Sequence, residues 1–251
     1  MAIMATLVLL TGLVGGWFAS ARIARHDLGV EIGAGVCLAV TLAWFALGHW
    51  ETLALRLIPW DDFVYFQELP LYLAVLWLLM LCLRRLSGFV RAMTALLVVV
   101  FALWSLAGVT GPLWLSVYLP RLQGTPATAF DTQSTGWSCA PAALAQALRR
   151  KGLATSERQV AVLAATSPLG GTSDRGLLRA AHRRGIPGAT LLRPAFWPDL
   201  RTAPKPVLAE WYLGQGVAHM ITITAVESDR VQVLDPLTGE QTYTRAEFER
   251  Y

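Results

Sequence analysis

The sequence contains no asparagine and only two lysines, Lys151 and Lys205. It is also poor in cysteine. Cys37 and Cys82 lie in long apolar runs, where cysteine usually serves as a small core residue, so Cys139 is the one thiol in a polar region. A single thiol there has no intradomain disulfide partner and cannot form a zinc site built from several cysteines. Because asparagine is missing, a group that orients a histidine must be Asp or Glu.

The excess of positive over negative charge is small as well. The chain has 21 Lys and Arg against 17 Asp and Glu, a net charge of +4 at pH 7. Residues 1–120 are neutral overall, so the whole excess lies in residues 121–251. There is no block of consecutive basic residues with interleaved aromatic residues, which argues against a nucleic-acid partner.

Apolar residues, in contrast, make up 55% of the chain, which is high for a soluble domain. They form four long runs before Pro120 and only short runs after it. A membrane-spanning helix needs roughly 20 mostly apolar residues, a length that the third run reaches only if it begins near Phe66. We predict a membrane domain over residues 1–120, a linker over 121–132 and a soluble domain over 133–251. The predicted membrane helices are 2–19, 30–47, 69–83 and 89–115, with Gly111-Pro112 ending or kinking the last.

A cleaved signal peptide is the alternative for the first run, because Ala19-Ser20-Ala21 fits an A-x-A cleavage site. The run has no basic segment before it and is long for a signal peptide. Three further apolar runs follow it. These features favour a retained helix.

Short loops rich in arginine mark the cytoplasmic side of a membrane protein. Two predicted loops are of this kind and lie on one side of a four-helix layout; they contain Arg22, Arg25, Arg84, Arg85 and Arg91. The chain is therefore predicted to be a multi-pass protein of a bacterial inner membrane, with both termini and the soluble domain on the periplasmic side. Its partners would be the lipid bilayer and, as an open alternative, another membrane protein. No charged residue lies at the helix centres, which argues against a transporter or channel.

The soluble half changes from helical to strand-like patterns along the chain. Helices are predicted from Cys139 to Lys151, from Ser156 onward, and from Ser173 or Asp174 to Arg184. Strands are predicted at 189–192, 206–213, 219–226, 231–234 and 241–243, followed by a short helix over 245–251. Helices first and an antiparallel sheet afterwards give an α+β domain.

Four residues of this half form a candidate catalytic site. Cys139 opens a helix, whose N-terminal partial positive charge favours a thiolate. His219 begins the strongest predicted strand, and Asp235 ends the next one. If these strands pair as a hairpin, both side chains lie at the end away from the turn, as a base and its orienting carboxylate require. Gln133, six residues before Cys139, would donate its amide to an oxyanion, with the Cys139 backbone N–H as the second donor.

Each of these residues taken alone has a simpler explanation. A cysteine near a helix start is more often structural, and Asp-Pro-x-x-Gly is a common turn. The other histidine of this half, His182, lies within a predicted helix among arginines and is most simply a surface residue. The occurrence of all four residues in this order and strand context favours catalysis.

The same residues lie in longer motifs: Q-x5-C from Gln133 to Cys139, the helix start C-A-P-A-A-L, Gly171-Thr172-Ser173, the strand H-M-I-T-I-T-A-V from His219, and Asp235-Pro236 with Gly239. Together these motifs, over residues 132–251, resemble the papain-like cysteine peptidases related to bacteriocin-processing, double-glycine leader peptidases. The resemblance implies that Cys139 is the nucleophile, His219 the general base, Asp235 the orienting residue and Gln133 the oxyanion donor.

The chain departs from that family in two ways. Ala140 stands where the family usually has glycine. The domain also follows membrane helices instead of preceding a transporter, and the chain has no ATP-binding motif. A double-glycine leader is therefore not implied as the substrate.

The sequence thus predicts a papain-like α+β domain on a four-helix membrane anchor. It would hydrolyse peptide bonds of a peptide or protein substrate through Cys139, His219, Asp235 and Gln133, with no cofactor and no metal. If an amine resolved the acyl-enzyme in place of water, the same site would be a transpeptidase. The alternative is a non-catalytic papain-like module that binds peptides or serves as an accessory subunit of a membrane assembly.

Overall fold

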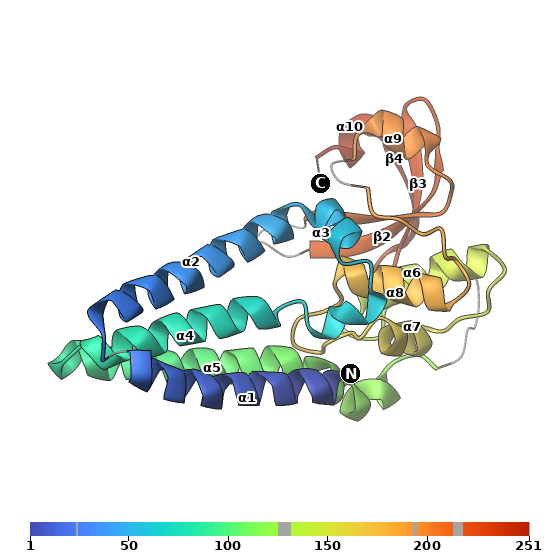
Figure 1. Ribbon diagram of the computed structural model, residues 1–251. Coiled ribbons are helices and arrows are strands. Elements are labelled where there is room, and N and C mark those ends of the chain that lie inside the picture. Colours follow the sequence, from blue (N-terminus) through green and yellow to red (C-terminus); the bar gives the residue numbers. More distant parts are fainter. Residues whose placement is uncertain (24, 125–131, 193–194, 213–217, 251) are drawn as a thin grey trace. The chain divides into compact units, whose positions relative to one another are not determined.

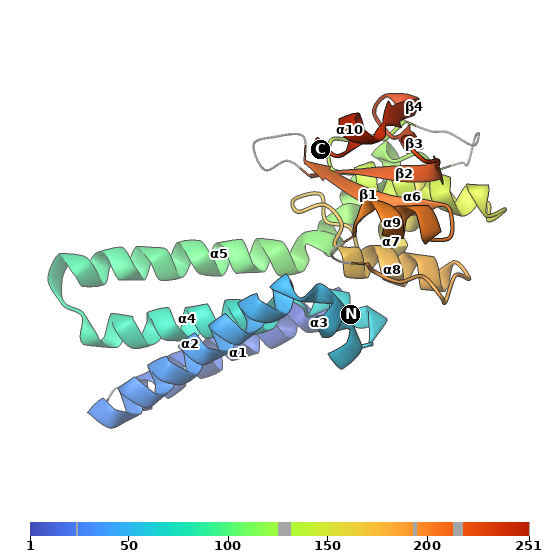
Figure 2. The same ribbon diagram turned by 90° about the horizontal axis from the view of Figure 1, so that it is seen from above.

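The computed structural model describes the chain except residues 24, 125–131, 193–194, 213–217 and 251, so most of the predicted linker 121–132 lies outside the described residues. The chain divides into two compact units, Met1–Leu113 and Trp114–Tyr251. Figures 1 and 2 show long helices in the first unit and a sheet with shorter helices in the second. Each unit is described by itself below.

The first unit contains the four predicted apolar helices, and their existence is confirmed. They are α1 (Ala2–Ile23), α2 (Asp27–His49), α4 (Leu69–Arg85) and α5 (Gly88–Tyr118), with the short α3 (Glu51–Leu57) and η1 (Asp61–Tyr65) between the second and third. The helical stretches long and apolar enough to cross a membrane are Ala2–Ile23, Leu28–Leu47, Asp61–Arg85, which includes η1 and α4, and Gly88–Arg121. Large apolar side chains point outward from them; Phe18, Phe45 and Trp104 are 69%, 73% and 69% exposed. Such surfaces suit lipid better than water.

Helix α5 corrects one expectation from the sequence. Of the two outcomes that Gly111-Pro112 suggested, an end of the helix or a kink in it, the end is wrong, because α5 continues to Tyr118 and leads into η2 (Leu119–Arg121). A proline in a helix removes one backbone hydrogen bond, a loss that apolar packing can outweigh. Here Leu115 beyond the proline is 4% exposed and belongs to a buried cluster with Leu122.

Helices α1 and α4 pack closely through small residues, a common device between membrane helices. The Trp77 indole of α4 donates a hydrogen bond to the Gly12 carbonyl of α1 at 2.9 Å. A Cβ atom on Gly16 would collide with that indole, whereas a Cβ atom on the neighbouring Gly15 would have no atom within 4 Å. Gly16 therefore permits the approach of the two helices.

The variant Gly16→Leu is expected to destabilise the helical unit by about 1–3 kcal/mol, because the indole must move and lose its bond to Gly12. Thermal unfolding of the purified protein in detergent measures this as a lower transition temperature. Gly15→Leu is the matched control and should leave the transition within about a degree of the wild type. Equal transitions for the two leucine variants would contradict the proposed contact.

The second unit combines helices with one sheet. Its helices are α6 (Cys139–Arg150), α7 (Glu157–Leu163), α8 (Asp174–Arg183), α9 (Trp197–Thr202) and α10 (Arg245–Phe248). Its strands β1 (Val207–Tyr212), β2 (Ala218–Val226), β3 (Arg230–Asp235) and β4 (Gly239–Thr244) pair antiparallel in the order β1-β2-β3-β4. The predicted antiparallel sheet is confirmed.

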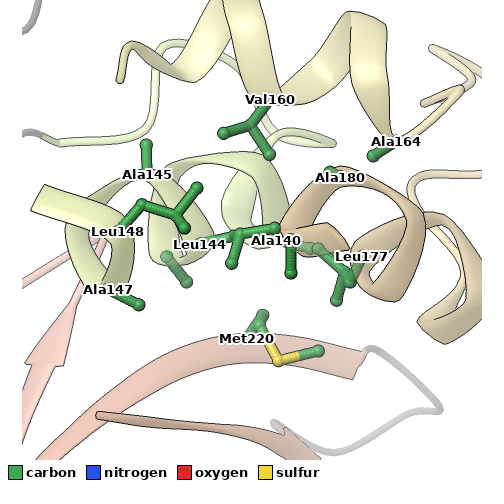
Figure 3. Packing of buried hydrophobic residues seen from close by; sticks show 12 residues of the cluster. Ala140, Leu144, Ala145, Ala147, Leu148, Val160, Ala164, Leu177, Ala180 and Met220 are labelled. Carbon is green, nitrogen blue, oxygen red and sulfur yellow. The ribbon is translucent and has the colours of Figure 1, made fainter. Parts of the chain in front are cut away.

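The sheet separates two apolar cores, as the alternation of side chains along a strand requires. Met220 of β2 points toward α6, where it meets Ala140, Leu144 and Leu177 in one buried cluster (Figure 3). The next residue, Ile221, belongs to the other cluster, which includes Trp197 of α9, Trp211 of β1 and Phe248 of α10. Helix α6 therefore packs on the face of β2 that presents Met220, the residue after His219.

Two details of this unit differ from the sequence predictions. The strand predicted at 189–192 is wrong, because these residues have no regular structure. Ala189 is partly buried against the α6 cluster, and its carbonyl lies 3.1 Å from His182 Nε2, whereas Leu192 is 51% exposed. His182 is accordingly half-buried and not a plain surface residue. Helix α9 was not predicted; Asp199 caps it by accepting from the Phe196 N–H at 2.8 Å.

Candidate active site

Cys139 is the first residue of α6, as the sequence predicts. The side chain of the preceding Ser138 does not cap the helix. It turns back instead, and its Oγ accepts from the Thr135 N–H at 3.0 Å. The thiol therefore stands at an N-terminus where free backbone N–H groups meet, and it is half-buried.

His219 and Asp235 lie side by side at the end of the β2–β3 hairpin away from its turn. His219 Nε2 is 2.7 Å from Asp235 Oδ1, and the two residues are 4% and 5% exposed. The hairpin register pairs Thr222 with Leu234, which brings the start of β2 beside the end of β3. The geometry is the one that strand pairing predicts for these two residues.

The turn after Asp235 fixes its carboxylate. Oδ1 also accepts from the Leu237 backbone N–H at 2.7 Å, and Oδ2 accepts from the Thr238 hydroxyl at 2.9 Å. Gly239 closes this turn with φ of 93°, a left-handed conformation that favours glycine. The motif Asp-Pro-x-x-Gly thus aims a carboxylate at the histidine as well as reversing the chain.

The surroundings of Cys139 favour its thiolate. Burial raises the pKa of the thiol, but hydrogen bonds from His219 and from the backbone N–H groups of Met220 and Ala140 outweigh it, so the pKa lies below its ordinary value. A nearby imidazolium adds to this lowering. A cysteine with a lowered pKa is a stronger nucleophile at neutral pH than an ordinary one.

The pKa of His219 moves the opposite way. Burial lowers it, but the hydrogen bonds to Cys139 and Asp235 and the negative charges of both raise it above its ordinary value. The pKa of Asp235 is lowered: burial raises it, and the Leu237 N–H, His219 and Thr238 more than compensate. Because Nε2 faces Asp235, Nδ1 is the ring nitrogen left for the sulfur.

Gln133 is held beside this turn. Its backbone N–H donates to the carbonyl of Pro236, the residue after Asp235, at 2.9 Å. Its side-chain Nε2 donates to the Thr135 carbonyl at 2.8 Å. The amide oxygen Oε1 is buried without a hydrogen-bond partner among the described residues, a situation that costs roughly 1–3 kcal/mol. The loop from Gln133 to Ser138 therefore holds the amide in a position that the amide alone does not favour.

The structure thus connects all four predicted residues, while His182 bonds elsewhere. The sequence did not indicate the sulfur's bond from the Met220 N–H, or the buried Glu157 that accepts from the Ser134 N–H at 3.0 Å. No local signal marks either, because both contacts join segments far apart in the chain. Among the residues that the structure describes, no group of His, Cys, Asp and Glu could hold a metal ion.

Two archaeal proteins are similar to the chain. An uncharacterized protein of Methanothermobacter marburgensis is 36% identical over 107 residues, which cover 43% of this chain and 70% of that protein. An uncharacterized protein of Methanothermobacter thermautotrophicus is 31% identical over 118 residues, which cover 47% of this chain and 78% of that protein. No model of a known protein family matches the chain.

Proposed function

The chain belongs to the same family as the two Methanothermobacter proteins, and from the geometry of its own site we propose that it is a membrane-anchored cysteine peptidase. The second unit would be a papain-like domain related to the double-glycine leader peptidases. The observation that carries the proposal is the hydrogen-bonded series of half-buried Cys139 with buried His219 and Asp235. A nucleophile, a base and a group orienting that base are the parts that nucleophilic acyl transfer needs.

The first half of the reaction makes an acyl-enzyme. The Cys139 thiolate attacks the carbonyl carbon of a peptide bond, and the carbonyl oxygen becomes an oxyanion. The backbone N–H of Cys139 and the second amide hydrogen of Gln133 donate to that oxyanion. The His219 imidazolium gives its proton to the leaving amine, the carbon–nitrogen bond breaks, and a thioester remains on Cys139.

Water completes the cycle. Neutral His219 takes a proton from a water molecule, whose oxygen attacks the thioester carbon. Collapse of this second intermediate breaks the carbon–sulfur bond, releases a carboxylic acid and restores the thiolate and imidazolium. Asp235 stays ionised throughout and holds the ring so that Nδ1 faces the sulfur. An amine in place of water would give a transpeptidase with the same residues.

The membrane part of the proposal rests on the helices and on charge. Four helices are long and apolar enough to span a bilayer. Arginines gather in the last turns of α1 and α4, at Arg22, Arg84 and Arg85. By the positive-inside rule these ends would be cytoplasmic, so the peptidase domain and both termini would lie outside the cytoplasmic membrane, where a peptide or protein substrate is met.

The test uses the full-length protein in lipid nanodiscs, incubated with a library of peptides and analysed by mass spectrometry. We expect new peptide termini, and heavy oxygen from labelled water in the new carboxyl groups if water resolves the acyl-enzyme. Protein whose Cys139 has been alkylated beforehand with iodoacetamide should give none. Absence of any alkylation-sensitive product would overturn the proposal.

A non-catalytic peptide-binding module is the competing interpretation, and thiol reactivity separates the two. An ordinary cysteine has a pKa of about 8.5 and reacts slowly with iodoacetamide below pH ~7. The lowered pKa of Cys139 predicts rapid reaction there. Slow reaction together with intact peptide binding would favour the module.

A further inference from the structure

Glu157 is a buried carboxylate at the start of α7 that takes no part in the bonds among Cys139, His219 and Asp235. It is 1% exposed. Its Oε1 accepts from the Ser134 backbone N–H at 3.0 Å, and its Oε2 accepts from the Ser134 hydroxyl. Ser134 directly follows Gln133. Both oxygens of this carboxylate therefore hold the loop that carries the proposed oxyanion donor.

The same carboxylate reaches the segment that follows η2. The Gln123 N–H lies 3.3 Å from Glu157 Oε2 and 3.0 Å from Ser134 Oγ. The neighbouring Arg158 adds two contacts: its N–H donates to the Gln123 carbonyl at 3.1 Å, and its guanidinium donates to the Leu122 carbonyl at 2.8 Å. The start of α7 thus joins the segment after α5 to the active-site loop.

Apolar packing strengthens this junction. The Trp137 ring, two residues before Cys139, meets the Tyr118 ring edge-on, with centroids 6.2 Å apart. Trp137 also packs on a buried cluster near the end of α5, which includes Leu115, Leu119, Leu122 and Ala161. The loop from Gln133 to Ser138 is consequently held by the sheet turn at one end and by the end of α5 and α7 at the other.

We propose that Glu157 is a positioning residue, which keeps the Gln133 amide in reach of the oxyanion by fastening Ser134 to the segment after α5. The inference rests on the proposed function, because it acts through Gln133. An oxyanion donor works only when it is held within roughly 0.5 Å of its productive place. The bond from Gln133 to Pro236 fixes one side of this residue, and Glu157 fixes the other through Ser134.

The variant Glu157→Gln keeps the volume of the side chain and replaces one of its two acceptor oxygens with an NH2 group. Three donors point at the carboxylate: the Ser134 N–H, the Ser134 hydroxyl and the Gln123 N–H. A glutamine offers one acceptor oxygen and places an NH2 group opposite at least one donor. With the amide oxygen on the Ser134 N–H, the NH2 group faces the Ser134 hydroxyl, which can turn to accept, and the Gln123 N–H, which cannot, so the contact with Gln123 is lost and the hold on the loop weakens.

The experiment measures kcat/KM for hydrolysis of p-nitrophenyl acetate by the full-length protein in nanodiscs. Gln133→Ala should lower kcat/KM by about 100-fold, as loss of one oxyanion donor does. Glu157→Gln should lower it about tenfold, mainly in kcat, because the donor is misplaced but present. The double variant should be no slower than Gln133→Ala, since Glu157 acts through that residue.

Two further readouts separate positioning from a general structural role. The pH profile of Cys139 alkylation by iodoacetamide should match the wild type in all three variants, because His219, Met220 and Ala140 still surround the sulfur. The matched control is Glu247→Gln on α10, on the other face of the sheet, where the carboxylate accepts from both the N–H and the hydroxyl of Thr244 at 2.8 Å. It should keep the wild-type kcat/KM.

Wild-type kcat/KM in Glu157→Gln, or losses that multiply in the double variant, would overturn the positioning role and leave the proposed function standing. Hydrolysis that does not depend on Cys139 in the wild type would overturn the proposed function instead. If Glu157→Gln does not fold, Ser134→Ala replaces it, since this change removes the hydroxyl with its bonds to Glu157 and from the Gln123 N–H and keeps the bond from the Ser134 N–H to Glu157. We expect Ser134→Ala to lower kcat/KM about threefold, and to cause no further loss when Gln133→Ala is already present. Wild-type kcat/KM in the Ser134→Ala variant would then overturn the inference.

Discussion

Full-length protein carrying Cys139→Ala is expected to be folded and to cleave no peptide above the uncatalysed background. The sulfur is the attacking atom, and neither His219 nor Gln133 can take its place as the nucleophile that forms the covalent intermediate. Removal of a nucleophile from a hydrolase of this kind lowers kcat by a factor on the order of 10⁴ or more. Cleavage of the peptide library and hydrolysis of p-nitrophenyl acetate measure the loss.

The matched control for this variant is Cys82→Ala. Cys82 is a free, exposed cysteine on α4 and so tests whether any other thiol contributes. It should retain wild-type turnover. The stability of Cys139→Ala should change little, because the side chain is small and only half-buried. Turnover in Cys139→Ala equal to that of the wild type would remove the cysteine peptidase assignment.

The placement of His219 and Asp235 illustrates what local sequence can predict. The strand led by His219 and the strand ended by Asp235 follow each other closely in sequence and pair antiparallel, and the register shift between Ile223 and Ala225 leaves both residues at the end away from the turn. The hairpin therefore brings the two residues together almost independently of the rest of the fold. The position of Cys139 at a helix start was equally predictable, since Pro141 suits the first turn of a helix.

Glu157 shows where such prediction ends. In sequence it is an acidic residue in the first turn of a helix, and Ser156 with Gln159 already forms the capping box there. Its partners Ser134 and Gln123 are 23 and 34 residues away. Their approach follows from the packing of α7 beside the end of α5. No periodicity or spacing in the sequence predicts that contact. Glu157 therefore looks like an ordinary helix-start residue, although its carboxylate holds the loop that follows Gln133.

The end of α5 and residues 189–192 differ from what local signals predicted. Helix α5 continues past Pro112 to Leu115, which is buried with Leu122, and Ala189 packs partly buried against the α6 cluster from a segment without regular structure. The four apolar helices and the antiparallel sheet depended on many residues at once and were predictable. The exact ends of elements depended on single contacts and were not.

His219→Ala is expected to raise the pKa of the Cys139 thiol above that of the wild type. In the wild type, the hydrogen bond and charge of His219 help to lower that pKa against burial, which raises it. Without the ring, burial opposes only the N–H groups of Met220 and Ala140. The fraction of thiolate near neutral pH should therefore fall, and peptide cleavage should fall by roughly 10³-fold because the general acid is also lost.

The sign of the wild-type pH profile follows from the two shifts. Cys139 loses its proton at a lower pH than an ordinary thiol, and His219 keeps its proton to a higher pH than an ordinary imidazole, so both pKa shifts favour the reactive thiolate–imidazolium ion pair. Turnover should rise through the lowered pKa of the pair and fall through the raised one, and both belong to the coupled pair. The measurement is the alkylation of Cys139 at pH values from about 5 to 10, a range that brackets both groups, with the modified peptide detected by mass spectrometry. His182→Ala is the histidine control. An alkylation profile in His219→Ala that matches the wild type would mean that the ring does not activate the sulfur, since no other charged partner lowers the pKa of that thiol.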